Sequence, residues 1–104
     1  MKVYWSDEAR QRLHEIKRYI TEDSPIAAED MVARLVRRSR TLGEPPLLGR
    51  RLPEFPESEL REVLERPYRL IYLLSARGVE IVTLMHYRQI LPSDMAAVRR
   101  EPDA

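Results

Sequence analysis

The sequence predicts an α+β fold in a single domain over residues 1–104: an N-terminal strand, an antiparallel helical hairpin and then a three-stranded antiparallel sheet. Two observations support this prediction. Apolar residues recur with helical spacing from Ser6 to about Gly43, whereas the chain from about Glu59 to Leu91 contains short runs of β-forming residues. The length of 104 residues is typical of one domain with one core.

The first half contains start and stop signals for two helices. Residues 1–5 are rich in strand-forming side chains, and Ser6 follows them where a helix N-cap is expected. Behind this cap, four apolar residues repeat at helical spacing and predict an amphipathic helix: Ala9, Leu13, Ile16 and Ile20. A second helix is expected to start with Ser24 as its cap and Pro25 in its first position, and Gly43 is placed to close it. Because few residues separate the two helices, they are expected to pack as an antiparallel hairpin.

The second half begins with a proline-rich connection. Residues 43–57 contain four prolines, which predicts an extended segment, and such long loops tend to be functional or bound to a partner. Three strands are then predicted, at Leu60–Glu65, Tyr68–Leu74 and Val79–Met85. Gly78 is expected to supply a positive φ angle in the turn of the last hairpin.

The middle strand is apolar on both faces. Its alternation places Leu70, Tyr72 and Leu74 on one face and Ile71 and Leu73 on the other. This pattern predicts a central strand that the helices cover on one side. The other side is expected to be covered by the C-terminal segment or by another protein. Residues 93–100 are expected to form a short helix capped by Ser93.

Composition excludes several classes of functional site. The chain has no cysteine, so disulfides, thiolate zinc sites and iron–sulfur clusters are excluded. With two histidines and three glycines, it shows neither metal-ligand spacing nor a glycine-rich phosphate loop. We therefore expect no metal and no cofactor. No apolar run is long enough to span a membrane and no signal peptide is evident, so a cytoplasmic protein without a membrane partner is expected.

Positive charge is concentrated in one stretch, although the formal net charge of the chain is only +1. Between Arg34 and Arg51 there are six arginines and one acidic residue, which gives this stretch a local net charge of +5. Arg34, Arg37 and Arg38 line the outer part of the second predicted helix with Arg40. They are candidate contacts for nucleic acid or for an acidic protein surface. The alternative is a solvated helix face.

A second candidate site lies on the predicted strands. Arg61 and Arg69 belong to adjacent strands, and His86-Tyr87-Arg88 ends the last one. Arginine suits phosphate or carboxylate groups, and a neighbouring histidine can act as an acid or base near neutral pH. If Arg69 and Arg88 share a face, they form a small cationic site at one end of the sheet. In the alternative, Arg69 makes a structural ion pair across the strands with Glu62 or Glu80.

The order of elements and the residues of the predicted sheet resemble the RelE/ParE superfamily of toxins from type II toxin–antitoxin modules. The resemblance covers nearly the whole chain and is carried by Val3–Ala9, Pro25–Ala28, Leu60–Glu62, Tyr68–Tyr72 and His86–Arg88. It implies the superfamily's fold and a hetero-oligomer with a cognate antitoxin, whose disordered segment wraps the helical hairpin and sheet. The basic stretch and an apolar groove beside the first helix are candidate docking places. The arginines considered for antitoxin or target binding are Arg34, Arg37, Arg38, Arg61, Arg69 and Arg88.

The superfamily divides by target, and this sequence resembles the ParE-like branch. RelE-like members are implied to be ribosome-dependent mRNA endonucleases, whereas ParE-like members are implied to inhibit DNA gyrase without nuclease activity. The strand Leu60–Glu65 lacks the paired lysines of RelE-like enzymes, and residues 91–94 lack their catalytic tyrosine. The resemblance therefore implies a gyrase-inhibiting toxin of the plasmid-stabilisation type, and no enzyme. The alternative is an endoribonuclease acting on mRNA at the ribosome, with Arg69, His86, Tyr87 and Arg88 as catalytic residues.

Overall fold

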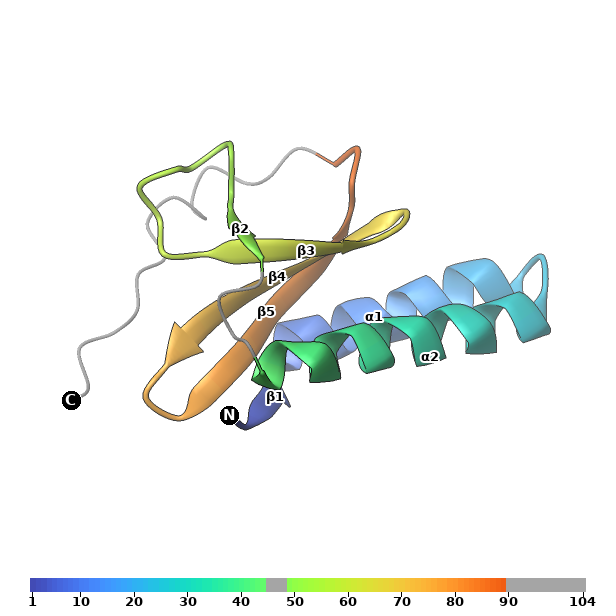
Figure 1. The fold of residues 1–104 in the computed structure, drawn as a ribbon. Coiled ribbons are helices and arrows are strands. Elements are labelled where there is room, and N and C mark those ends of the chain that lie inside the picture. The colour runs from blue at the N-terminus through green and yellow to red at the C-terminus, as the bar shows by residue number, and fades with distance from the viewer. Residues whose placement is uncertain (45–48, 90–104) are drawn as a thin grey trace.

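The computed structural model describes residues 1–44 and 49–89, and it confirms the α+β fold. Two antiparallel helices pack on one face of a five-stranded sheet (Figure 1). The predicted helix at residues 93–100, with its cap Ser93, lies outside the described residues. The elements in chain order are β1 (Val3–Trp5), α1 (Asp7–Thr21), α2 (Pro25–Arg40), β2 (Arg50–Arg51), β3 (Arg61–Glu65), β4 (Tyr68–Ser75) and β5 (Gly78–His86).

Both helices begin where the sequence predicts. The Ser6 hydroxyl accepts a hydrogen bond from the backbone N–H of Ala9 at 3.0 Å, and the Ser24 hydroxyl accepts one from Ala27 at 3.1 Å. Each bond satisfies an N–H group that lacks a partner within the first helical turn. Pro25 occupies the first turn of α2, where its missing N–H costs nothing.

The role expected of Gly43 needs correction. Helix α2 ends at Arg40 and continues into a 3₁₀ turn, Thr41–Gly43, in which Gly43 does not adopt the left-handed backbone of a helix-ending glycine. A Cβ atom at Gly43 would lie 2.7 Å from the carbonyl oxygen of Met1. The N-terminal ammonium group also donates to the Gly43 carbonyl at 2.7 Å. Glycine is needed here because the N-terminal strand passes so close.

The sheet contains the predicted meander, the predicted N-terminal strand and one strand, β2, that was not predicted. Strands β3, β4 and β5 pair antiparallel in that order, and Gly78 has the expected positive φ angle of 130° at the turn between β4 and β5. Strand β1 joins one edge by pairing parallel with β5, with Val3 opposite Val79. At the other edge β2 pairs with β3, with Arg50 opposite Glu62. Part of the proline-rich connection, expected to be extended and unpaired, is therefore a short strand.

The inner face of the sheet carries the larger core. Leu70 and Tyr72 of β4 are fully buried against the helices, together with Leu35 of α2 and Ile81 of β5. The predicted apolar stripe of α1 packs against this core through Leu13, Ile16 and Ile20, while its fourth member, Ala9, is itself buried there. The helices thus cover one side of the middle strand, as predicted, and the structure shows that it is the side of Leu70 and Tyr72.

The outer face of the sheet has a second, smaller core. Ile71 and Leu73 of β4 and Met85 of β5 pack with the residues that border a loop between β2 and β3. We call this loop, residues 52–60, the strap; it contributes Leu52, Leu60 and the half-buried Phe55. In Figure 1 the strap and the helices lie on opposite sides of the sheet. The expected cover was the C-terminal segment, which lies outside the described residues, or another protein; the structure instead shows part of the chain's own connection there.

Candidate functional site

Arg69 lies on the outer face of β4 and is bound by two carboxylates. Its Nε donates to Glu62, and its two terminal nitrogens donate to the two oxygens of Glu54 at 2.8 and 3.0 Å. The Nε of Arg50 donates to the second oxygen of Glu62 at 2.7 Å. The four side chains form a continuous chain, Arg50–Glu62–Arg69–Glu54, with balanced charge. Only 6% of the Arg69 side chain and 1% of the Glu62 side chain are exposed.

The hydrogen bonds among these four side chains favour the charged forms of Glu54 and Arg69. Hydrogen bonds from Arg69 hold the pKa of Glu54 below its ordinary value of 4.5, although partial burial opposes this change. Burial by itself disfavours a charged Arg69, but the bonds to Glu54 and Glu62 outweigh it and raise the pKa of Arg69. The ion pair with Glu62, foreseen as one alternative, is therefore present. Glu80 of β5, the other possible partner, lies opposite Leu73 of β4.

Arg61 helps to fix the point at which the chain returns to the sheet. It donates to the carbonyl of Gly49 at 2.9 Å, while the N–H of Gly49 donates to the buried hydroxyl of Tyr72 at 2.8 Å. A Cβ atom at Gly49 would collide with the Glu62 carbonyl and the Tyr72 ring, so this close approach requires glycine. Burial raises the pKa of Tyr72 above its ordinary value of 10.

The sequence His86-Tyr87-Arg88 forms a compact group at the end of β5. The ring of His86 stacks on Tyr87 with centroids 5.0 Å apart, and its edge meets Tyr68 at 5.8 Å. Arg88 lies 5.4 Å from the Tyr87 ring centre and donates to its hydroxyl at 3.0 Å. The backbone N–H of Arg88 donates to Nδ1 of His86 at 3.2 Å, which in the neutral ring places the proton on Nε2.

The structure therefore brings three of the four candidate catalytic residues together and separates the fourth. No hydrogen bond, ion pair or ring contact within residues 49–89 joins Arg69 to His86, Tyr87 or Arg88. The guanidinium of Arg69 is held under Glu54, whereas Tyr87 and Arg88 are exposed. A cationic site shared by Arg69 and Arg88 would require Arg69 to leave its carboxylates.

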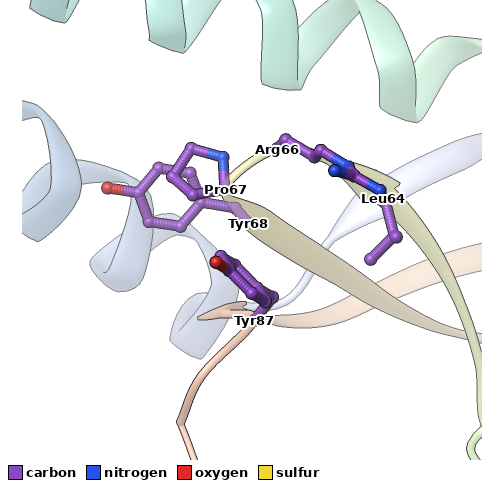
Figure 2. A pocket seen from close by; sticks show the side chains of 5 residues that line it. All are labelled: Leu64, Arg66, Pro67, Tyr68 and Tyr87. Carbon is purple, nitrogen blue, oxygen red and sulfur yellow. The ribbon is translucent and has the colours of Figure 1, made fainter.

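A hollow of about 420 Å³ lies beside this group, at the turn between β3 and β4. Figure 2 shows the rings of Pro67, Tyr68 and Tyr87 around it, with Leu64 and Arg66 across from them. A second groove of about 370 Å³ runs along α1 and shares Tyr68 as a lining residue. Its other lining residues include Ile16, Tyr19 and His86. The sequence indicated a groove beside the first helix. It gave no signal for a hollow lined by Leu64 of β3 and by Arg66 and Pro67 of the turn after it, because turn residues carry no periodicity that would show what lies beside them.

The basic face of α2 is less charged than the sequence suggests. Arg34 donates to Glu65 at 3.0 Å and lies 3.8 Å from Asp30, so its charge is neutralised within the chain. Arg37 and Arg38 line a hollow of about 300 Å³ with Arg34, and make no ion pair with any residue in 1–44 or 49–89. The Nε of Arg38 is buried there without a hydrogen-bond partner among those residues.

No group of three or more His, Asp or Glu residues is arranged to hold a metal ion in residues 1–44 and 49–89. Over that part of the chain, no helix has both the length and the apolar composition needed to cross a bilayer.

Comparison with known proteins connects the fold to one family. Residues 3–91 match the family described as the ParE toxin of the type II toxin–antitoxin system parDE. Y4kP of Sinorhizobium fredii, a candidate toxin, is 39% identical over 93 residues, which cover 88% of this chain and 93% of that protein. A chain from the chromosomal ParDE toxin–antitoxin system of P. aeruginosa superposes with a TM-score of 0.69 at 22% identity. The superposition covers 83% of this chain and 95% of the other; at that identity it supports the fold.

Proposed function

Because the chain belongs to the ParE toxin family of type II toxin–antitoxin systems, we propose that it inhibits DNA gyrase and that a cognate antitoxin neutralises it by direct binding. On this proposal the protein acts in the cytoplasm by occupying its target and catalyses no reaction of its own. It is stored as a hetero-oligomer with the antitoxin. On a plasmid, such a pair would contribute to plasmid stabilisation.

The observation that carries this proposal is the state of Arg69. A site that cleaves a phosphodiester needs cationic donors aimed at the charge that develops on the phosphate. Three nitrogens of Arg69 donate instead to Glu62 and Glu54. Strand β3, with the sequence Arg61-Glu62-Val63-Leu64-Glu65, contains no lysine that would replace it. The arrangement supports inhibition by binding over cleavage.

A second function is favoured by the group at the end of β5. One ring nitrogen of His86 accepts a hydrogen bond, and Tyr87 stacks on the His86 ring and lines the hollow of Figure 2. Arg88 lies against the Tyr87 ring. A histidine, a phenol and a guanidinium are suited to general acid–base catalysis and charge stabilisation at a ribose 2′-OH. The second candidate is therefore an mRNA endoribonuclease that uses His86, Tyr87 and Arg88, with Arg69 recruited only if it leaves Glu54.

One paired assay separates the two functions. Toxin released from its antitoxin is added to a gyrase supercoiling reaction and, in parallel, to ribosomes translating a defined mRNA. We expect supercoiling to be lost while the mRNA stays intact. Cut mRNA together with unaffected gyrase would establish the endoribonuclease, and His86→Ala should then abolish the cleavage in a protein that still folds.

The antitoxin is proposed to use one feature of each helix. The groove along α1 offers apolar contact through Ile16, Leu84 and Tyr68. The hollow on α2 offers Arg37 and Arg38, whose positive charges are complementary to an acidic segment. Arg34 was included in this set from its sequence position, but its bond to Glu65 leaves it fewer donors for a partner.

Charge reversal tests the contribution of α2. The double variant Arg37→Glu/Arg38→Glu should weaken antitoxin binding by about tenfold or more at low salt and by less at high salt, because screening removes the interaction between exposed charges. Isothermal titration across a salt series measures both effects. The control Arg10→Glu/Arg77→Glu makes the same change of charge on exposed residues elsewhere. Equal losses in both variants, or an affinity that does not respond to salt, would exclude a docking role for this face.

A further inference from the structure

The strap is closed at its base and fixed to the sheet there. Leu52 and Leu60 are fully buried, and the N–H of Leu52 donates to the Leu60 carbonyl at 3.4 Å. Ser58 is also buried, and its hydroxyl accepts from the N–H of Leu60 at 3.1 Å. These contacts make the base part of the outer core. The base therefore remains in place whatever the rest of the strap does.

The tip of the strap, residues 53–57, is built differently. Four of its five residues are exposed, and only Phe55 is half-buried. The backbone hydrogen bonds of Phe55 are local ones: its N–H donates to Leu52 at 3.1 Å, and its carbonyl accepts from Ser58 at 3.0 Å. Segments with local hydrogen bonds and little buried surface open at a free-energy cost well below that of global unfolding.

Two side chains of the tip reach the sheet. The Phe55 ring packs against the outer core, and Glu54 holds both terminal nitrogens of Arg69. Arg69 stands directly opposite Met85 in the pairing of β4 with β5, and both side chains point to the outer face. The tip therefore covers Arg69 and packs against the outer core to which Met85 belongs.

We propose that residues 53–57 form a hinged cover, which lifts from the outer face of the folded sheet when the catch between Glu54 and Arg69 is released. Arg69 keeps its bond to Glu62 during this movement, so no buried charge is left without a partner. Lifting uncovers Met85 and its apolar neighbours while the helices stay on the inner face. The proposal rests on the fold and the ion pairs and is independent of the target of the toxin.

Single cysteines test the proposal because the chain has none of its own. Met85→Cys places a thiol in the outer core against which the tip packs, and Leu84→Cys places one at the next position, in the core that faces the helices. Both positions are buried in the closed protein, with exposed fractions of 6% and 2%. With a thiol-reactive dye in the full-length chain under native conditions, we expect Cys labelling in Met85→Cys to be at least about tenfold faster than in Leu84→Cys, because local opening is far more frequent than global unfolding.

Substitution of the catch gives the sharper result. Adding Glu54→Gln should accelerate labelling in Met85→Cys by up to about fivefold, the effect of losing a partly exposed charge-assisted bond. Labelling in Leu84→Cys should stay far slower than in Met85→Cys when the same substitution is present. Glu57→Gln is the matched control: it removes the same charge from the same tip, at a residue that forms no ion pair with residues 1–44 or 49–89. Equal labelling rates at both thiols would overturn the proposal, because global unfolding would then control access. Equal effects of Glu54→Gln and Glu57→Gln on labelling in Met85→Cys would overturn it too, because the bond between Glu54 and Arg69 would then not hold the tip.

A second readout needs no introduced cysteine. Hydrogen exchange of the Phe55 amide should be faster than that of the amides of β5 and should respond to Glu54→Gln but not to Glu57→Gln. Exchange of Phe55 at the same rate as β5 would contradict a separate opening, even if one of the cysteine variants fails to fold.

Discussion

The two faces of β4 are stabilised in different ways. On the inner face, Leu70 and Tyr72 are covered by two long helices and by residues from almost the whole first half of the chain. On the outer face, Ile71 and Leu73 are covered by a short strap, beside which Arg69 is buried among carboxylates. The inner face owes its stability to apolar area and the outer face depends strongly on charge pairing. A substitution on the inner face should therefore act mainly by removing apolar contacts, and one on the outer face mainly by breaking ion pairs.

The largest effect is expected on the inner face. Leu70 is fully buried, so Leu70→Ala should remove about 2–5 kcal/mol from the free energy of unfolding, because it loses apolar contacts and leaves a cavity. This is a large fraction of the total for a domain of this size. Urea unfolding followed by circular dichroism measures it. Leu64→Ala on the neighbouring strand is the control, since Leu64 is 40% exposed and should cost much less. Similar small losses in both variants would contradict the importance of the inner core.

On the outer face the largest loss is expected at Glu62. Glu62→Gln removes the carboxylate that accepts from both Arg50 and Arg69, and it should cost about 3 kcal/mol, because a guanidinium that is 6% exposed loses a charged partner. Glu65→Gln breaks the more exposed pair with Arg34 and should cost no more than about 1 kcal/mol. If chemical unfolding gives the two variants the same free energy of unfolding, Glu62 contributes no more to stability than a carboxylate in a surface ion pair.

The smallest effect is the dependence of the outer face on pH. The pKa of Glu54 is lowered in the folded state by its bonds to Arg69, so its contribution is complete above the unfolded pKa of about 4.5 and is lost as the pH falls through the lower, folded value. Because Glu54 is 40% exposed, the change should not exceed about 1 kcal/mol. Unfolding experiments from about pH 6 to about pH 3 should show the difference between wild type and Glu54→Gln shrinking with acidity. A constant difference over that range would exclude this titration.

The inner face could be predicted from the sequence because every signal for it is local or periodic. Ser6 and Ser24 sit at the helix starts, Gly78 at the turn, and the apolar stripe of α1 recurs at helical spacing. One irregularity of the sheet could not be predicted from local or periodic signals. A shift in register between Ile71 and Tyr72 lets Ile81 and Leu84, three residues apart on β5, face the same core.

The outer face could be predicted only in part. The alternation of β4 indicated that something covers Ile71 and Leu73, and Glu62 was considered as a partner of Arg69 because it lies on the adjacent predicted strand. Glu54 was not foreseen, because it belongs to a proline-rich loop with no period that would place it over a particular residue. The grouping of His86, Tyr87 and Arg88 follows from their adjacency in the chain, whereas the direction in which the Arg69 side chain is held depends on the fold.

The parallel pairing of β1 with β5 affects how the protein is made. Val3 pairs with Val79, so the first strand has no partner in the sheet until more than two-thirds of the chain has left the ribosome. Contacts between such distant segments form late and slow the search for the native state. During synthesis the helical hairpin can form early, but the sheet it packs on is completed only after β5 emerges. The first strand of a nascent chain therefore stays unpaired for most of its translation, and the sheet is completed only near the end of synthesis.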